Sequence, residues 1–348
     1  MKNKVLIIGP SIRKSRGGMA SVIQNISSDK YLNSKFKINV FSSFVDGNIV
    51  IRFLYSIFKF SYFILIFNRY DVFHIHVASY GSFFRKKLYI DTLRFFKKNI
   101  ILHLHGATFL EFFDNSSKQK IINNTFKKAN KVIVLSESWK REINKRMNLD
   151  NVEVINNGVI FHNNHFGLGK DNSFLFLGRL GKRKGTYDLL KAIKIVGKDY
   201  PQIRFYFCGD GEIEQVNKLI KEEKLEHFVS VEGWCSKNKI KEILRVVSTM
   251  ILPSYNEGLP MSILESMEQG KIIISTNVGG IPEVVVDNEN GYLVEPGNVD
   301  QIKESIIKVI SNHKKNIVIS NNNISKIHDH FNVKVINKKI GEIYSSLL

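Results

Sequence analysis

TMILPSYNEGLPMSILESMEQGKIIIS, residues 249–275, contains one complete unit of the fold. It begins with a short apolar run, Thr249–Leu252, and ends with a second one, Lys271–Ser275. A helical pattern over Pro260–Gln269 lies between them. Both runs are continuous rather than alternating in polarity, as strands buried on both faces are. This order of strand, helix and strand predicts two parallel strands joined by a right-handed crossover.

The same order recurs along the whole chain. Twelve apolar runs alternate with longer helical segments, which predicts an α/β fold of two doubly wound, Rossmann-like domains. The change of domain falls in Phe161–Asn172, where Asn, Gly and His interrupt the apolar periodicity. We therefore expect domains at residues 1–165 and 166–330, followed by an amphipathic segment at 331–348. The other ten runs are Val5–Ile8, Ile38–Phe41, Val72–Val77, Ile100–Leu104, Val132–Leu135, Val152–Ile155, Phe174–Leu177, Arg204–Cys208, Phe228–Val231 and Gly291–Val294.

The composition is that of a globular protein. Hydrophobic residues make up 43% and charged residues 24% of the 348 residues, which argues against a disordered chain. The two cysteines, Cys208 and Cys235, cannot form a disulfide framework, so we expect a reducing compartment. The apolar run near Met1 is too short for a signal peptide, and we interpret it as a first strand.

The net charge of +19 is concentrated in the first half. Residues 1–165 contain 26 Lys and Arg against 10 Asp and Glu, whereas residues 166–348 contain 25 against 22. A basic half beside a near-neutral half indicates an acidic partner, and nucleic acid and anionic membrane are the candidates.

Ile49–Phe67 is the one segment that could enter a membrane. Its 19 residues are enough to span a bilayer, but Arg52 and Lys59 interrupt them. On a helix Arg52, Ser56 and Lys59 share one narrow face. The segment therefore fits a spanning helix, a buried core helix or an amphipathic helix on a membrane surface.

Two loops that follow strands could bind phosphate, because ligands of doubly wound folds lie beyond the carboxyl ends of the strands. Gly17 and Gly18 open a helix and allow backbone N–H groups to approach an anion, although a tight turn explains them equally well. Arg179 and Lys184 lie just before another helix start. They offer a bidentate fork and a mobile point charge, which suit a diphosphate. A solvated basic loop is the alternative.

Glu257 and Glu265 are eight residues apart around the predicted helix Pro260–Gln269. Eight helical residues rise about 12 Å, whereas hydrolase carboxylate pairs stand roughly 5 to 9.5 Å apart. We interpret the pair as holding two ends of one elongated ligand, such as a sugar and a ribose, through their hydroxyl groups. A surface glutamate and a capping glutamate are the alternative.

His105 follows the strand Ile100–Leu104, and we expect it to point into the mouth of a cleft. His74, His76 and His103 lie within strands, where core positions are expected. The HxH spacing could suggest zinc, but no nearby Cys or carboxylate completes a ligand set, so we expect no metal site. The sequence also lacks a DxD motif, a GxxxxGK[ST] loop and a GxSxG elbow. Charge compensation for a diphosphate must then come from Arg179, Lys184 and helix N-termini, without a cofactor.

Together these residues resemble the large retaining glycosyltransferase family four. Its members have the GT-B fold, in which two Rossmann-like domains face a central cleft. The resemblance covers nearly the whole chain and is most specific in the second domain. It is carried by Gly17-Gly18, His105-Gly106, Asn156-Asn157-Gly158, Gly178-Arg179, Lys184-Gly185, Gly209-Asp210-Gly211 and Pro253–Gly297.

The resemblance implies a role for each candidate residue. Arg179 and Lys184 would bind the donor diphosphate, and Glu265 would hold the ribose hydroxyls. The first domain would bind the acceptor and the second the nucleotide sugar, while the C-terminal helix would cross back to the first domain. Residues expected near the donor sugar, its phosphates or the reaction centre are His105, Glu257, Gly258, Leu259, Gly17, Gly18 and Gly209.

The resemblance also implies a reaction. A sugar would be transferred from a nucleoside diphosphate, uridine being favoured by family frequency, with retention at the anomeric carbon. The acceptor would be a glycan, lipid-linked, in surface polysaccharide synthesis. A nucleotide-sugar epimerase of similar architecture and a basic nucleic-acid-binding protein are the alternatives.

The first domain departs from the family in being unusually aromatic and basic. Phe83-Phe84-Arg85-Lys86-Lys87 and Phe95-Phe96-Lys97-Lys98 suit an anionic membrane face. We therefore expect a cytoplasmic enzyme, peripheral on the inner face of the cell membrane, that binds no nucleic acid.

Overall fold

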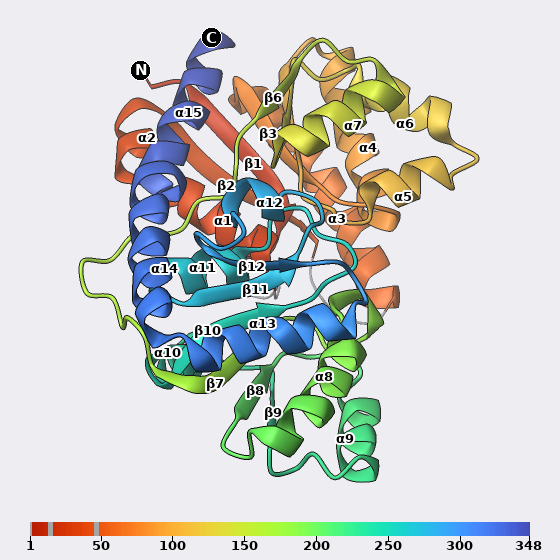
Figure 1. Cartoon of the computed structure of the whole chain (residues 1–348). Helices are drawn as coiled ribbons and strands as arrows, with labels where there is room; N and C mark the ends of the chain where they lie inside the picture. The colour runs from red at the N-terminus through yellow and green to blue at the C-terminus, as the bar shows by residue number, and fades with distance from the viewer. Residues whose placement is uncertain (1, 13–16, 45–48) are drawn as a thin grey trace. The chain divides into compact units, whose positions relative to one another are not determined.

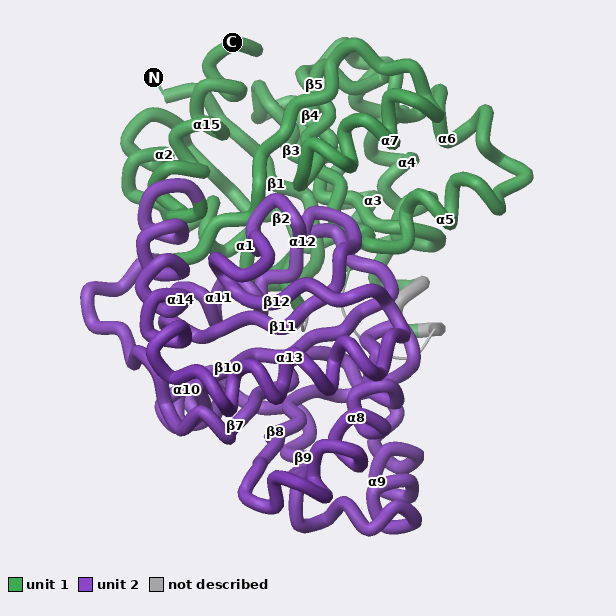
Figure 2. The backbone as a smooth tube through the Cα atoms, viewed as in Figure 1, with its two compact units in different colours: residues 1–160, 331–348 green, residues 161–330 purple. Residues whose placement is uncertain are grey.

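The computed structural model describes residues 2–12, 17–44 and 49–348, except for the side chains of residues 49, 50, 52 and 53. Expectations about residues 13–16 of the glycine loop and about the side chain of Arg52 concern parts outside this description. The chain forms two compact units (Figure 2). Unit 1 contains residues 1–160 and 331–348, and unit 2 contains residues 161–330. The division lies five residues before the expected one.

Unit 1 is built on a six-stranded, wholly parallel sheet with the order β2-β1-β3-β4-β5-β6 (Figure 1). Its strands are β1 (Lys4–Pro10), β2 (Lys37–Phe44), β3 (Val72–Val77), β4 (Asn99–Leu104), β5 (Lys131–Val134) and β6 (Val152–Val154). Its helices are α1 (Gly18–Ser27), α2 (Lys30–Lys35), α3 (Ile49–Ile66), η1 (Phe67–Arg69), α4 (Gly81–Phe95), α5 (Phe109–Asp114), α6 (Gln119–Phe126), α7 (Glu137–Met147) and the C-terminal α15 (Val333–Ser346).

Unit 2 has a second parallel sheet of six strands with the order β12-β11-β10-β7-β8-β9. Its strands are β7 (Lys170–Leu177), β8 (Arg204–Cys208), β9 (Val229–Gly233), β10 (Val247–Leu252), β11 (Ile272–Thr276) and β12 (Gly291–Val294). Its helices are η2 (Lys182–Lys184), α8 (Thr186–Asp199), α9 (Ile213–Glu222), α10 (Lys237–Val246), α11 (Met261–Glu268), α12 (Ile281–Val284), α13 (Val299–Ser311) and α14 (His313–Lys326), before a π-helical turn at Ile327–Phe331. Each predicted run falls on one of the twelve strands, which confirms the α/β fold class.

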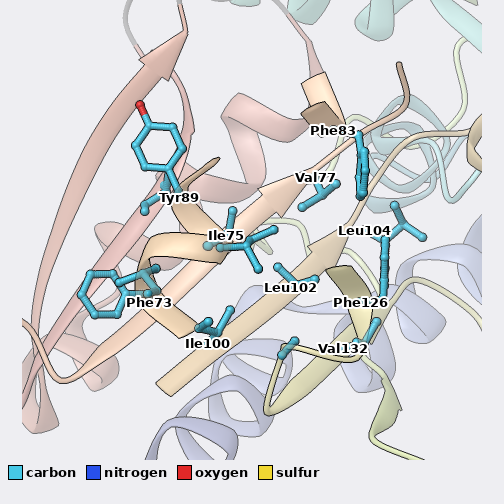
Figure 3. Packing of buried hydrophobic residues seen from close by; sticks show 14 of the residues in the cluster. Phe73, Ile75, Val77, Phe83, Tyr89, Ile100, Leu102, Leu104, Phe126 and Val132 are labelled. Atoms are coloured by element: carbon cyan, nitrogen blue, oxygen red, sulfur yellow. The ribbon is translucent and has the colours of Figure 1, made fainter. Parts of the chain in front are cut away.

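The core of unit 1 shows why continuous apolar strands were needed. Alternate residues of two strands point into one cluster with Phe83 and Tyr89 of α4 (Figure 3). These residues are Phe73, Ile75 and Val77 of β3 and Ile100, Leu102 and Leu104 of β4. The Tyr89 ring lies edge-on against Phe63 of α3, 4.8 Å between centroids. Each fully buried side chain of this size stabilises the fold by about 1.5–3 kcal/mol.

The opposite face of β3 and β4 carries histidines, because side chains alternate across a strand. His74 and His103 are buried there, and the His74 Nδ1 atom lies 2.7 Å from the Tyr344 hydroxyl of α15. The same helix meets α1, where the Asn337 side chain donates to the Asn25 carbonyl at 3.2 Å. α15 therefore covers the histidine face.

α3 is not a buried core helix along most of its length. Among its described side chains only Phe63 and Ile66 are buried, whereas Leu65 is 76% exposed. Lys59, a described member of the expected polar stripe, is half-buried, and its ammonium lies 5.4 Å from the Phe41 ring centroid of β2. Over the described part of the chain, every helix is too short or too polar to cross a membrane.

The first aromatic and basic cluster also differs from its expected role. Phe83 and Lys86 are buried in unit 1 rather than facing a membrane. The second cluster is open, because Phe95, Phe96 and Lys97 are all exposed. The difference follows from the helical spacing, which turns Phe83, Lys86 and Tyr89 toward the sheet.

Candidate active site

In unit 2, Arg179 is presented by two loops that lock together at the carboxyl ends of β7 and β8. The Gly178 N–H donates to the Cys208 carbonyl at 3.0 Å, and the Leu180 N–H donates to the Asp210 carbonyl at 2.7 Å. A side chain at Gly209 would collide with the Gly178 carbonyl, so glycine is required for this approach. The Arg179 side chain itself is exposed. Its guanidinium is available to an anion while its backbone is fixed.

Lys184 ends the single turn η2, immediately before α8. Gly185 follows it with φ 72°, and a side chain at Gly185 would collide with the Pro253 carbonyl. This tight contact brings Lys184 against the loop that precedes α11, where its ammonium forms an ion pair with the Glu257 carboxylate. Arg183 reinforces the contact, since its Nη1 donates to the Asn256 carbonyl at 2.9 Å.

The Glu257 carboxylate is therefore engaged in an ion pair with Lys184. Glu257 as a residue is only 5% exposed, and the Lys184 ammonium compensates the negative charge of its carboxylate. α11 begins at Met261, so the stretch from Glu257 to Pro260 is not helical and the expected rise of about 12 Å does not measure the separation of the two carboxylates. Gly258 and Leu259 are buried beside Glu257. The sequence offered no sign of the ion pair, because its partners are far apart along the chain.

Glu265 lies on the exposed side of α11. Its pKa is raised to about 7, mainly because surrounding protein displaces water from the carboxylate, with a further rise from Glu268 and an opposing effect of Lys237. The residue nevertheless keeps an exposed surface, so a ligand can reach it. A ligand hydroxyl that donates to it would favour the charged form.

In unit 1, His105 follows β4 as expected, and its backbone N–H donates to the Val77 carbonyl at 2.9 Å. Its Nε2 atom lies 2.8 Å from Nδ1 of His76 on the neighbouring strand β3. Burial lowers the pKa of His105 to about 3, so the imidazole is neutral at physiological pH. Because His76 occupies Nε2, the Nδ1 atom is the nitrogen left for a ligand.

His74, His76 and His103 occupy core positions as expected, but they are not all satisfied. The Nε2 atoms of His76 and His103 have no hydrogen-bond partner among the described residues. The three side chains offer nitrogens within 4.8 Å of one another. The His74 ring, however, stacks on the other two and is only 6° from parallel with His103, while the His76 and His103 rings are tilted by 31°. Zinc needs lone pairs that converge at about 2.0–2.1 Å, so this arrangement would require ring rotation.

Gly17 and Gly18 stand at the N-terminus of α1. Gly17 is the N-cap residue with φ 131°, a conformation that favours glycine, and no side chain caps the helix there. Both residues are exposed. Their place at a helix start agrees with the sequence interpretation, and the role in phosphate binding stays a prediction.

Lys86 is a polar residue of unit 1 whose place the sequence analysis missed. Its ammonium donates to the Ser43 hydroxyl, which in turn donates to the Gly9 carbonyl at 3.0 Å. Burial lowers the pKa of Lys86 to about 7. The helical spacing of Phe83, Lys86 and Tyr89 could have placed it on the buried face.

Comparison with known proteins matches both units to glycosyltransferase families. A family model described as glycosyl transferases group 1 matches residues 160–326, and one described as glycosyltransferase family 4 matches residues 36–161. The chain belongs to the family-four glycosyltransferases of the GT-B fold. This membership decides for a transferase and against the epimerase and the nucleic-acid-binding protein.

Several relatives and solved structures are similar to this glycosyltransferase. Two uncharacterized glycosyltransferases of Methanocaldococcus jannaschii are 29% and 28% identical, over 70% and 84% of this chain and 66% and 80% of their own. An Escherichia coli galactosyltransferase acting on α-D-GlcNAc-diphosphoundecaprenol is 30% identical over 51% of this chain and 47% of its own. The fold matches sucrose-phosphate synthase of Thermosynechococcus elongatus (TM-score 0.82, 16% identity, 99% of both chains) and Anabaena HepE with UDP-glucose (0.79, 20%, 99% of both).

Proposed function

We propose that this glycosyltransferase transfers a sugar from a UDP-sugar, with retention at the anomeric carbon, to a lipid-linked glycan in surface polysaccharide synthesis. The observation that carries the proposal is the cationic corner of unit 2, where exposed Arg179 and the Lys184–Glu257 pair lie beside the start of α8. Uridine is supported by the UDP-glucose complex of HepE, which shares the fold.

Charge compensation at the leaving group is the main chemical role of this corner. As the sugar departs, negative charge grows on the diphosphate oxygens. Arg179 extends from a fixed backbone and Lys184 is oriented by Glu257, and α8 adds the positive end of its dipole. Because these groups stabilise the departing diphosphate more than the intact donor, they lower the barrier. No divalent ion is required in this scheme.

Glu257 and Glu265 serve different parts of the donor. The buried Glu257 orients the Lys184 ammonium, and the backbone from Gly258 to Leu259 meets the donor sugar. Glu265 accepts hydrogen bonds from the ribose hydroxyls in its charged form. The acceptor hydroxyl attacks on the face that the diphosphate leaves, and the departing phosphate takes its proton.

His105 contributes as a neutral polar group. With Nε2 held by His76, its Nδ1 is directed by that hydrogen bond to meet a hydroxyl of the donor sugar. A neutral imidazole can donate or accept there without adding charge to the reaction centre. Gly17 and Gly18 at the start of α1, and Gly209 beside Arg179, allow the backbone to approach the donor phosphates.

The acceptor side of the proposal places unit 1 on the anionic inner face of the cell membrane. The apolar face of α3, defined as Ile51, Leu54, Ile57, Phe58, Tyr62, Ile64 and Leu65, is exposed. Its far end adjoins the end of α4, where the Phe67 and Phe96 rings lie 4.8 Å apart. Arg69, Arg94 and Lys97 are exposed around these aromatic groups. An open apolar helix flanked by cations suits lipid tails and anionic headgroups together.

A nucleotide-sugar screen tests the donor assignment. Thermal shifts with UDP-, GDP-, ADP- and dTDP-sugars in the presence of EDTA should single out UDP-sugars, because a bound donor stabilises the folded state by mass action. NMR of the product should show the donor's α or β configuration preserved. Stabilisation by another nucleotide alone, or inversion, would contradict the corresponding part of the proposal.

A further inference from the structure

Tyr80 has an unusual backbone conformation for a non-glycine residue. It joins β3 to α4 with φ 53° and ψ −130°. Asn148, another residue of positive φ in unit 1, lies in the ordinary left-handed helical region with ψ 69°. The Tyr80 conformation is outside that region and is a true outlier for a bulky side chain. Glycine would adopt it without strain.

Packing does not explain why a tyrosine stands there. The Tyr80 residue is 54% exposed. Its ring contacts the Phe112 ring of α5, with 4.9 Å between centroids and 54° between planes. This contact fixes the orientation of the ring while leaving much of its surface open. A strained position therefore carries an exposed aromatic side chain.

The turn that carries Tyr80 packs on the turn that carries His105. The Thr108 hydroxyl donates to the Ser79 hydroxyl at 3.1 Å. A side chain at Gly106 would stand 2.8 Å from the Ser79 hydroxyl, so the two turns are in direct contact. The backbone bond from His105 to Val77 closes the same arrangement. The turn that carries Tyr80 is thus held against the turn that carries His105, at the carboxyl ends of β3 and β4.

We propose that the Tyr80 ring is the platform on which the acceptor sugar stacks. A pyranose presents an apolar C–H face and polar hydroxyl edges. An exposed tyrosine matches it with an apolar ring face and a polar tip at low cost in side-chain entropy. The Ser79 and Thr108 hydroxyls lie on the same pair of turns to meet the sugar edge. The inference rests on the proposed function and names the residue that binds the sugar of the acceptor.

Because the Tyr80 backbone is strained, loss of its side chain is not expected to lower the melting temperature. The Tyr80→Gly variant removes the ring and the strain together, so it should keep or raise the melting temperature while the KM for the acceptor rises at least tenfold. The Tyr80→Phe variant keeps the platform and should stay within threefold of wild type. The Lys224→Gly variant, at another exposed residue of positive φ (55°), should leave both KM values unchanged.

A panel of alkyl glycosides and alkyl-diphosphate-linked sugars provides candidate acceptors. The acceptor that the wild-type protein glycosylates fastest is used for the KM measurements. Thermal shift with UDP-sugar is measured on the same samples. Unchanged donor stabilisation with a raised acceptor KM in Tyr80→Gly supports the inference. Wild-type acceptor KM in that variant, or a melting temperature several degrees lower with transfer retained, would overturn it.

Failure of the two proposals can be told apart. A wild-type protein that no UDP-sugar stabilises contradicts the proposed function. A wild-type protein that is stabilised by a UDP-sugar and glycosylates the panel, but whose acceptor KM is unchanged in the Tyr80→Gly variant, contradicts the Tyr80 inference alone.

Discussion

Lys184 and Glu257 meet as an ion pair between two loops of unit 2, although 73 residues separate them in the sequence. Glu257 is nearly inaccessible to solvent, so the pair holds a compensated charge inside the protein. Loss of one partner leaves the other buried and uncompensated, which is strongly destabilising. In the proposed function the donor diphosphate approaches the same ammonium, so Lys184 would serve both the fold and the reaction.

Substitutions at Lys184 can separate its contribution to stability from its proposed contribution to the transfer rate. Lys184→Ala should reduce the transfer rate at least ~100-fold, corresponding to about 2.7 kcal/mol for one lost donor to the developing charge. It should also lower the melting temperature, because Glu257 loses its partner. The Lys184→Ala, Glu257→Gln double variant should recover the melting temperature and not the rate. Lys182→Ala, at an exposed lysine of the same turn, is the control. Near-normal turnover of Lys184→Ala would refute its role.

Glu265 should make donor binding depend on pH. Since its pKa is raised to about 7, the carboxyl is largely protonated at pH 6 and charged at pH 8. The charged form is the better acceptor for ribose hydroxyls, so donor affinity should weaken as pH falls from 8 to 6, at most about tenfold per pH unit. Isothermal titration with a UDP-sugar, whose diphosphate does not titrate in this range, measures the effect. A slope that Glu265→Gln leaves unchanged would show that another group is responsible.

The strands and their parallel order were predictable because both depend on local pattern. Continuous runs such as Val72–Val77 must be buried on both faces, and this strand begins and ends where the run does. The positions of Arg179 and Gly209 in loops were also predictable, because each residue comes directly after the end of a predicted strand. The pairing of Lys184 with Glu257 was not, because it depends on how two distant loops pack.

α3 shows the opposite limit of sequence reasoning. Its apolar composition fits a core helix and a membrane helix equally well, and only the packing of neighbouring elements decides which side is covered. Phe63 is buried against Tyr89 whereas Leu65 is open. Tyr80 likewise could not be singled out, since no local pattern reports a strained backbone.

The histidines of β3 and β4 should make the protein sensitive to acid. Burial lowers the pKa values of His74, His76 and His103, so these residues stay neutral in the folded state. In the unfolded chain they take up protons near pH 6.5. Stability is therefore complete above that pH and falls below it, by up to ~1.4 kcal/mol per pH unit for each histidine.

Denaturant melts between pH 7.5 and 5 measure this sensitivity. The His103→Leu variant, which removes one buried imidazole with an unpartnered nitrogen, should show a shallower loss of stability on acidification. An equally steep loss in the variant would mean that other groups control acid unfolding.

The apolar face of α3 should mediate binding to anionic lipid. Wild-type protein should float with phosphatidylglycerol vesicles and much less with phosphatidylcholine vesicles, and moderate salt should weaken the binding. The Leu54→Asn, Phe58→Asn, Leu65→Asn triple variant should lose flotation at least tenfold while remaining folded. The Ile317→Asn, Val318→Asn variant, at exposed apolar residues of unit 2, is the matched control. Equal flotation of the two variants would contradict the assignment of α3.

A crystal structure of the protein with UDP, grown in EDTA, tests the central claim most directly. We predict that the diphosphate contacts the Arg179 guanidinium and the Lys184 ammonium at the start of α8, with the ribose hydroxyls on Glu265. A diphosphate bound away from both cations, or UDP that enters only when manganese replaces the chelator, would contradict the account.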